Sequence, residues 1–158
     1  MGPCEGILKL LEASSEILVV EDDPVLGNML RELLLDAGYR VQWAQDVISA
    51  LSALERHPID LITLDMELGT YSGRGLLALL KADPRTSDIP VIVVSSCQMD
   101  PGVRRLAENV LSKPFNIAPL LQMIGAAIDR RRGSRLEPWR EAAPADSLEV
   151  EVAREVLD

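Results

Sequence analysis

Ile-Leu-Val-Val-Glu-Asp-Asp-Pro, at residues 17–24, is the stretch that decides the fold class. Four aliphatic residues in succession suit a strand that is buried on both faces, as in a parallel sheet covered by helices. Asp23 followed by Pro24 is typical of a helix N-cap and first turn, and Gly38 suits the end of that helix. The stretch therefore predicts a buried strand, an acidic turn and a helix in direct succession.

The same alternation of strand and helix recurs along the chain. Further strand-like runs lie at 39–44, 59–64, 91–94 and 109–112. Apolar residues at helical spacing lie at 46–54, 75–82, 103–107 and 119–128. Five strand-helix units in a row predict a parallel sheet with helices on both faces, in the α/β class. Ligands of such sheets bind beyond the carboxyl ends of the strands, so the chemistry is expected there.

Composition excludes several classes of protein. The chain has 158 residues, enough for one ordinary domain, and a net charge of -9, which argues against direct binding to nucleic acid or to an anionic membrane. Two cysteines and one histidine make neither a disulfide framework nor a zinc site. Since no apolar run is long enough to span a membrane, we expect a soluble protein of the reducing cytoplasm.

The character of the chain changes after Arg132. Residues 133–158 contain seven acidic residues against three arginines, and Gly133 and Pro138 interrupt the helical pattern. We predict an extension at 1–15 with a short helix near 7–11, a domain at 16–132 and an acidic tail at 133–158. The tail alternates apolar and acidic residues from Leu148 to Val152, as an added edge strand would, although one helical face fits equally well. Docking of this tail on its own domain or on a second copy, as a homodimer, is a further hypothesis.

Polar residues stand where the predicted strands end. Glu21, Asp22 and Asp65 would converge on one edge of the sheet, where like charges raise each other's pKa unless a cation joins them. Oxygen ligands without Cys or His suit Mg²⁺. Ser95 and Lys113 end the next two strands and would add a hydroxyl donor and an ammonium group to the same edge. Acids, a hydroxyl and a lysine together predict a site for a phosphoryl group.

These motifs together resemble the receiver domain of two-component response regulators. The resemblance covers residues 17 to about 132. It rests on 17–24, on Asp60-Leu-Ile-Thr-Leu-Asp65 followed by Gly73, on Pro90-Val-Ile-Val-Val-Ser95 and on Lys113-Pro-Phe115. It implies a CheY-like, flavodoxin-like (β/α)5 fold, doubly wound, with five parallel strands in the order 2-1-3-4-5.

The resemblance also implies roles for the residues at the strand ends. Asp22 would bind Mg²⁺ directly, Glu21 through water, and the backbone carbonyl of Glu67 would be a further ligand. Asp65 would be both a ligand and the phosphoacceptor, attacking the phosphorus of a phosphohistidine on a kinase or phosphotransfer protein. Lys113 would offset the charge of the transferred group.

A switch follows from the same resemblance. Ser95 would donate its hydroxyl to the phosphoryl group and draw the following loop inward, which would shift the face made by the fourth helix, fifth strand and fifth helix. A downstream protein would bind that face. Ser96 competes for this role, although the register of the apolar run favours Ser95. The peptide bond between Lys113 and Pro114 is cis in the family and is expected to be cis here.

Three positions need a separate interpretation. Val110 stands where receivers usually carry the Tyr or Phe that moves with the hydroxyl residue, so the usual readout is missing. Gly69 stands where the family usually has proline, which should loosen that loop. Asp23 is interpreted as an N-cap in preference to a metal ligand.

The favoured function is therefore a receiver without an attached output domain, working as a phosphorylatable switch in two-component signal transduction. It would promote only its own phosphorylation and dephosphorylation and would not be an enzyme for other substrates. A pseudo-receiver that keeps the fold without cycling phosphate is an alternative that Val110 allows. A small Mg²⁺-dependent phosphohydrolase is another, but it needs an acid/base residue, for which only Glu67 is a candidate.

Overall fold

The structure, a computed structural model, describes residues 14–142 except 70 and 97. The predicted short helix near 7–11 and the patterned segment at 148–152 lie outside the described residues. Elements of the sheet belong to a compact unit formed by Ser14–Ile128, and residues from Asp129 onward belong to a second unit.

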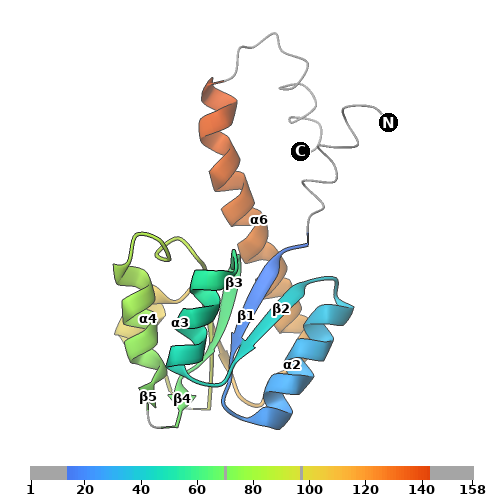
Figure 1. Cartoon of the computed structure of the whole chain (residues 1–158), viewed down its shortest axis with the longest axis vertical. Coiled ribbons are helices and arrows are strands. Elements are labelled where there is room, and N and C mark those ends of the chain that lie inside the picture. Colours follow the sequence, from blue (N-terminus) through green and yellow to red (C-terminus); the bar gives the residue numbers. More distant parts are fainter. Residues whose placement is uncertain (1–13, 70, 97, 143–158) are drawn as a thin grey trace. The chain divides into compact units, whose positions relative to one another are not determined.

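Five parallel strands form the central sheet in the order β2-β1-β3-β6-β7. The strands are β1 (Glu16–Val20), β2 (Arg40–Ala44), β3 (Leu61–Asp65), β6 (Val91–Ser95) and β7 (Asn109–Ser112). Numbered along the chain within this sheet, the order is 2-1-3-4-5, so the predicted fold class and strand order are confirmed. β1, β2 and β3 point toward the end of the unit where β4 and β5 lie (Figure 1), so the residues that follow these strands gather there.

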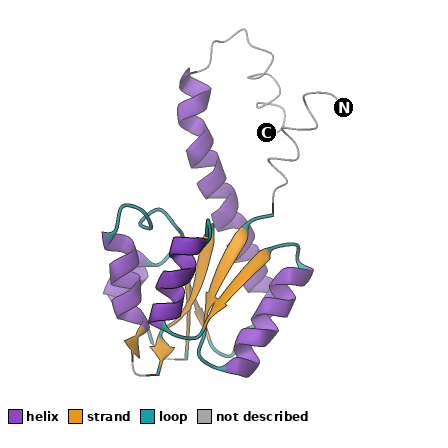
Figure 2. Ribbon diagram, viewed as in Figure 1, coloured by secondary structure: helices purple, strands orange, loops and turns teal. Residues whose placement is uncertain are grey.

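Helices cover both faces of the sheet (Figure 2). They are α2 (Pro24–Asp36), α3 (Val47–Arg56), α4 (Gly73–Ala82), α5 (Pro101–Leu106) and α6 (Ile117–Ala142). Three of them begin at an aspartate whose carboxylate accepts a backbone N–H of the first turn: Asp23 before α2, Asp46 before α3 and Asp100 before α5. β1, β2 and β6 are thus each followed by an aspartate that starts the next helix.

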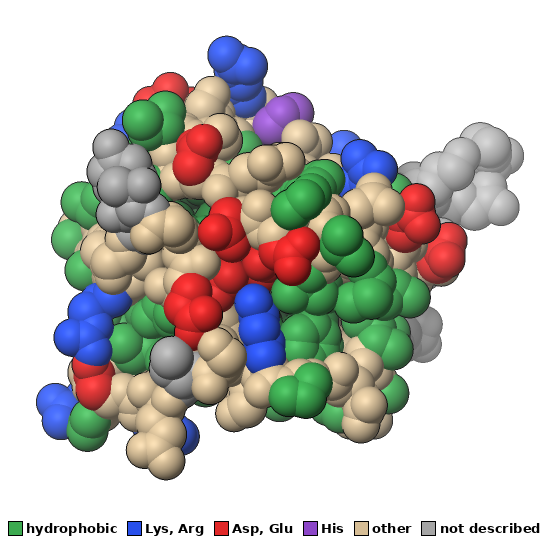
Figure 3. All heavy atoms as spheres, turned by 90° about the horizontal axis from the view of Figure 1, so that it is seen from below, with side chains coloured by type: hydrophobic (Ala, Val, Ile, Leu, Met, Phe, Trp, Pro, Cys, Tyr) green, Lys and Arg blue, Asp and Glu red, His purple; other side chains and the backbone are tan. Residues whose placement is uncertain are grey.

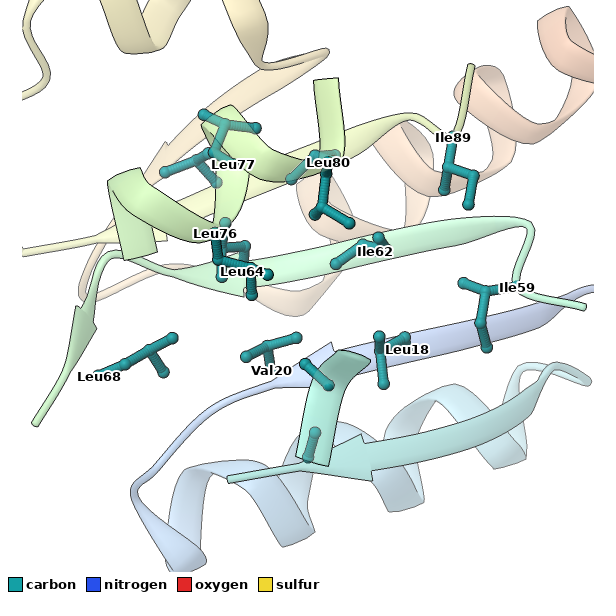
Figure 4. Packing of buried hydrophobic residues seen from close by; sticks show 14 of the residues in the cluster. Leu18, Val20, Ile59, Ile62, Leu64, Leu68, Leu76, Leu77, Leu80 and Ile89 are labelled. Carbon is teal, nitrogen blue, oxygen red and sulfur yellow. The ribbon is translucent and has the colours of Figure 1, made fainter. Parts of the chain in front are cut away.

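The sheet separates two apolar clusters. On one face Leu18, Val20 and Ile62 pack with Leu76 and Leu80 of α4 (Figure 4). On the other face Ile17 and Val19 share a cluster with α2 and α6. Successive residues of β1 therefore enter different clusters, because side chains alternate across a strand, and this explains why the central strands are apolar throughout.

A short antiparallel hairpin follows β3 and was not predicted. β4 (Glu67–Leu68) pairs with β5 (Tyr71–Ser72). Two residues in each strand are too few to produce a hydrophobic period, so the sequence pattern does not reveal them. Gly69 lies between these strands with φ of 57°, which glycine adopts readily.

Helix α6 is longer than the pattern at 119–128 predicts. It runs from Ile117 to Ala142, through Gly133 and Pro138, which were expected to interrupt it. A glycine inside a helix costs about 1 kcal/mol and a proline about 3 kcal/mol, while the flanking Arg, Leu, Glu and Ala residues are strong helix formers that favour continuation. Among the described helices, including α6, none has the length and apolar character to cross a membrane.

Candidate functional site

The acidic turn after β1 is held by backbone and side-chain hydrogen bonds. Glu21 is 2% exposed, and its N–H donates to the carbonyl of Ala44 at 3.0 Å, which extends the pairing of β1 with β2. The Oε1 atom of Glu21 accepts the N–H of Asp23 at 3.2 Å. The carboxylate of Asp23 accepts the N–H of Val25 at 2.9 Å, so its interpretation as the N-cap of α2 is confirmed.

Asp65 is the last residue of β3 and is 3% exposed. Its Oδ1 accepts the N–H of Glu67 at 2.9 Å. The start of α4 lies against this strand end, since a Cβ on Gly73 would come within 2.5 Å of the Asp65 carbonyl oxygen. A glycine at the start of α4 is therefore needed for the helix to approach the backbone of Asp65 this closely.

Three carboxylates meet at this edge, as the strand ends predict. One carboxylate oxygen from each of Glu21, Asp22 and Asp65 lies within 4.8 Å of the others. Figure 3 shows acidic side chains gathered in the middle of this face with a basic side chain beside them. The order of the strands places β1 next to β3, which brings residues far apart in the sequence to one point.

Lys113, which follows β7, completes the charge arrangement. Its Nζ lies 3.2 Å from Oδ2 of Asp65 and 3.3 Å from Oε2 of Glu21, and its side chain is 21% exposed. Its backbone N–H donates to the carbonyl of Ser95 at 2.8 Å, which fixes the residue beside the end of β6. The Lys113–Pro114 peptide bond is cis, as expected.

Burial and neighbouring charges shift the pKa values of Glu21 and Lys113. Burial first, and then the charge of Asp65, raise the pKa of Glu21 from 4.5 to about 7, against the opposing effect of Lys113. Burial alone lowers the pKa of Lys113, but the charges of Glu21 and Asp65 outweigh burial and raise it. The lysine is therefore an ammonium at neutral pH, while Glu21 holds its proton more tightly than an exposed glutamate.

An open cleft of about 710 Å³ lies over these residues. Glu21, Asp22, Asp65 and Lys113 line it together with Asp23 and hairpin residues that include Glu67. The side chain of Glu67 accepts a hydrogen bond from the hydroxyl of Ser96 at 2.5 Å. The cleft thus combines acids, one cation and hairpin backbone on a solvent-accessible edge.

The donor set fits a magnesium ion. Carboxylate oxygens from Glu21, Asp22 and Asp65 are close enough to share one cation, and they are the hard ligands that Mg²⁺ prefers. Burial first, and then the charge of Asp65, raise the pKa of Glu21, and a bound cation would favour the ionised form of this carboxylate. The open cleft leaves room for the waters that Mg²⁺ keeps. Coordination by the backbone carbonyl of Glu67, which lines the cleft, stays a prediction.

The two serines at the end of β6 differ in their surroundings. Ser95 is 1% exposed and follows Val94, the register partner of Asp65, so it lies at the same edge of the sheet. It is not among the residues that line the cleft. Ser96 is exposed and binds Glu67. The role of Ser95 toward a phosphoryl group stays a prediction.

Val110, which stands where receiver domains usually carry Tyr or Phe, is partly buried. It lies opposite Val93 in the pairing of β6 with β7 and packs against the apolar cluster that contains α4. An aliphatic side chain in this place fills space in the core and has neither a ring nor a hydroxyl group.

The sequence interpretation missed one contact to the acidic turn. The indole N–H of Trp43, in β2, donates to the backbone carbonyl of Glu21 at 2.9 Å. No local pattern reveals this contact, because the spacing of apolar residues indicates which face a side chain takes but not which distant atom it reaches.

Comparisons with known proteins agree with this geometry. A family model described as the response regulator receiver domain matches residues 17–125. The transcriptional regulatory protein PrrA of Mycobacterium tuberculosis is 37% identical over 145 residues, covering 88% of this chain and 60% of that protein. The DNA-binding dual master transcriptional regulator RpaA of Synechocystis is 32% identical over 118 residues, covering 72% of this chain and 49% of that protein. The chain thus spans about half the length of RpaA and less than two thirds of the length of PrrA.

A solved structure extends the comparison to the site. The receiver domain of the sensor histidine kinase PA1611 from Pseudomonas aeruginosa has a magnesium ion coordinated in its active site cleft. It is 28% identical, with a TM-score of 0.66 over 73% of this chain and 98% of that chain.

Proposed function

Because the chain belongs to the response regulator receiver domain family, we propose that it accepts a phosphoryl group on Asp65 and passes the signal on through a protein contact. The donor would be a phosphohistidine of a histidine kinase or phosphotransfer protein. In this reaction an oxygen of Asp65 attacks the phosphorus, a P–O bond forms and the P–N bond breaks. The imidazole leaves with the electron pair of that bond and takes up a proton, and an acyl phosphate remains.

The observation that carries the proposal is the contact of Lys113 with Asp65. Nζ of Lys113 lies 3.2 Å from Oδ2 of Asp65, within reach of a phosphoryl oxygen attached to that carboxylate. A fixed ammonium at this point offsets negative charge that builds on the phosphoryl oxygens during transfer. Burial of Asp65 at the base of the cleft restricts the approach to the open side.

Glu21, Asp22 and Asp65 would hold Mg²⁺, with the carbonyl of Glu67 as a further ligand. The ion supplies positive charge that lets an anionic donor approach three carboxylates. Within the protein, Glu21 is fixed by its contacts with Asp23 and Lys113, so its side chain is in place before a ligand arrives. Asp22, the more exposed of the acidic pair, is the side chain best able to reach a hydrated ion.

The output would be a change in the face made by α5, β7 and the part of α6 up to Ile128. Asp100 supports this idea, because it caps α5 and also forms an ion pair with Arg74 at the start of α4. Movement of the loop between β6 and α5 would strain that contact. Since Val110 offers no aromatic ring, we propose that the signal leaves through this loop and the α5 cap.

Other parts of the function are proposed on the same grounds. The protein would act as a phosphoacceptor in the cytoplasm and not as an enzyme for other substrates. Its partners would be a kinase or phosphotransfer protein and a downstream protein, and a homodimer would be one form of output. The transcriptional regulators among its relatives are longer than this chain, so the nature of the final output is not carried over from them.

The test is incubation with acetyl phosphate and Mg²⁺ followed by intact mass spectrometry. We expect one phosphoryl group on the wild type, lost on treatment with hydroxylamine, and none on Asp65→Asn. Asp36→Asn is the matched control, because Asp36 is an exposed aspartate at the end of α2 and should not affect the adduct.

Each other outcome contradicts the proposal in a recognisable way. Absence of an adduct on the wild type would favour the pseudo-receiver scaffold, which the aliphatic Val110 allows. An adduct that persists in Asp65→Asn would place the acceptor elsewhere. Repeated turnover of a phosphomonoester would favour the phosphohydrolase.

A further inference from the structure

Trp43 binds the peptide unit between the two acidic residues of the turn after β1. Its indole N–H donates to the carbonyl oxygen of Glu21 at 2.9 Å. That carbonyl belongs to the peptide bond that joins Glu21 to Asp22. Since a peptide unit is planar, a partner that fixes the direction of the carbonyl also fixes the plane from which Asp22 continues.

The backbone of Glu21 is thereby held on both sides by β2. Its N–H donates to the carbonyl of Ala44 at 3.0 Å, and its carbonyl accepts from Trp43. The first contact continues the regular pairing of β1 with β2. The second comes from a side chain, after the strand has ended, at the point where the acidic pair turns into the cleft.

The indole is itself fixed by helix α2. A Cβ on Gly27 would lie 2.3 Å from ring atoms of Trp43, so the ring rests directly on the helix backbone. The guanidinium of Arg31 lies 5.9 Å from the ring centroid on the same helix. The position of the indole N–H is therefore set by two elements, β2 and α2, neither of which contains a residue of the cluster formed by Glu21, Asp22 and Asp65.

We infer that Trp43 is a positioning residue for the cation site, acting through the Glu21–Asp22 peptide unit. Its hydrogen bond keeps the two acidic side chains directed toward Asp65. This inference rests on the proposed Mg²⁺ site and adds to it a residue outside the acidic cluster. If Trp43 only covered the edge of the sheet, its aromatic ring would be sufficient. The positioning role requires the indole N–H as well.

The test compares Mg²⁺ affinity in variants that change either the indole N–H donor or the packing of the ring. Trp43→Phe keeps an aromatic ring against Gly27 and removes the donor. Gly27→Ala keeps the indole but forces it away from its seat on α2. Arg31→Met is the matched control, because it removes the cation near the ring and leaves the hydrogen bond in place.

We expect isothermal titration to show Mg²⁺ binding weakened about fivefold in Trp43→Phe, as for the loss of one hydrogen bond that positions a ligand. Gly27→Ala should be weakened at least as much, and Arg31→Met should bind like the wild type. Circular dichroism at the titration temperature verifies that each variant is folded.

NMR tests the connection between Trp43 and the cation site in the wild-type protein, with the indole N–H retained. In an NMR spectrum of the wild type, the indole N–H resonance of Trp43, assigned by its absence in Trp43→Phe, should shift with Mg²⁺ at the same dissociation constant as backbone amides of the acidic turn. Asp22→Asn should remove this shift.

The outcomes distinguish failure of the positioning role of Trp43 from failure of the Mg²⁺ site itself. If Trp43→Phe lowered the melting temperature but bound Mg²⁺ like the wild type, the tryptophan would be structural only and the inference would be wrong. If the wild type itself bound no Mg²⁺, the cation site would be wrong, and the positioning role would fall with it.

Discussion

Glu21 shows how a single position acquires its properties from burial. In the unfolded chain its carboxyl group titrates near 4.5, and in the folded protein its pKa is about 7, first because it is buried and then because Asp65 is close. Between these values the folded state keeps a proton that the unfolded state has lost. Raising the pH through this window therefore lowers the free energy of unfolding, by up to about 3 kcal/mol.

This predicts a specific pH dependence in the absence of divalent cations. Glu21→Gln, which resembles the protonated acid, should become more stable relative to the wild type as the pH rises from 4.5 to about 7. Urea unfolding of both proteins across this range measures the difference. Parallel stability curves for the two proteins would contradict the raised pKa.

Helix α2 illustrates how the site depends on a whole element. Asp23 starts the helix, since its Oδ1 accepts the N–H of Val25 at 2.9 Å, and the residues just before it are the acidic pair. The same helix carries Gly27 and Arg31, on which Trp43 rests. A helix that begins one turn later would release both the acidic turn and the indole.

Removal of the cap tests this dependence. Asp23→Ala should lower the free energy of unfolding by about 1 kcal/mol, because the first turn of α2 loses its acceptor. Asp23→Asn should unfold like the wild type, since asparagine caps helices equally well and the charge of Asp23 is not needed for this role. Equal losses in both variants, measured by urea unfolding, would assign the effect to the charge.

The compact unit formed by Ser14–Ile128 contains a sheet between two separate apolar clusters. Ile62 belongs to the cluster with α3 and α4, and Ile124 of α6 belongs to the cluster on the other face. The side chains of the two clusters lie on opposite faces of the sheet. Their contributions to stability should therefore be independent.

A double substitution tests this independence. Ile62→Val and Ile124→Val should each lower the free energy of unfolding by about 0.5–1.5 kcal/mol, through the loss of one buried methyl group. The double variant should lose the sum of the two within about 0.5 kcal/mol. A larger deviation in urea unfolding would show that the sheet transmits changes in packing from one face to the other.

Much of the fold and part of the site could be predicted from the sequence. Buried strands, capped helices and their alternation are local patterns, so they identified the α/β class and the strand ends at Glu21, Asp65, Ser95 and Lys113. The hairpin at Glu67–Ser72 and the extent of α6 to Ala142 were missed. The hairpin is too short to show a period, and the helix continues through residues that usually end one.

What the sequence determined by itself is the identity and order of the groups at the carboxyl edge, because a parallel sheet places every strand end on the same side. Only the tertiary structure decided how those groups are held. Lys113 contacts Glu21 across 92 positions of the sequence, and Trp43 donates to the Glu21 carbonyl across 22 positions. Ser96 contacts Glu67 across 29 positions. Such contacts depend on side-chain direction and on burial, which also raises the pKa of Glu21. A local pattern contains neither, since both arise only when distant elements pack together.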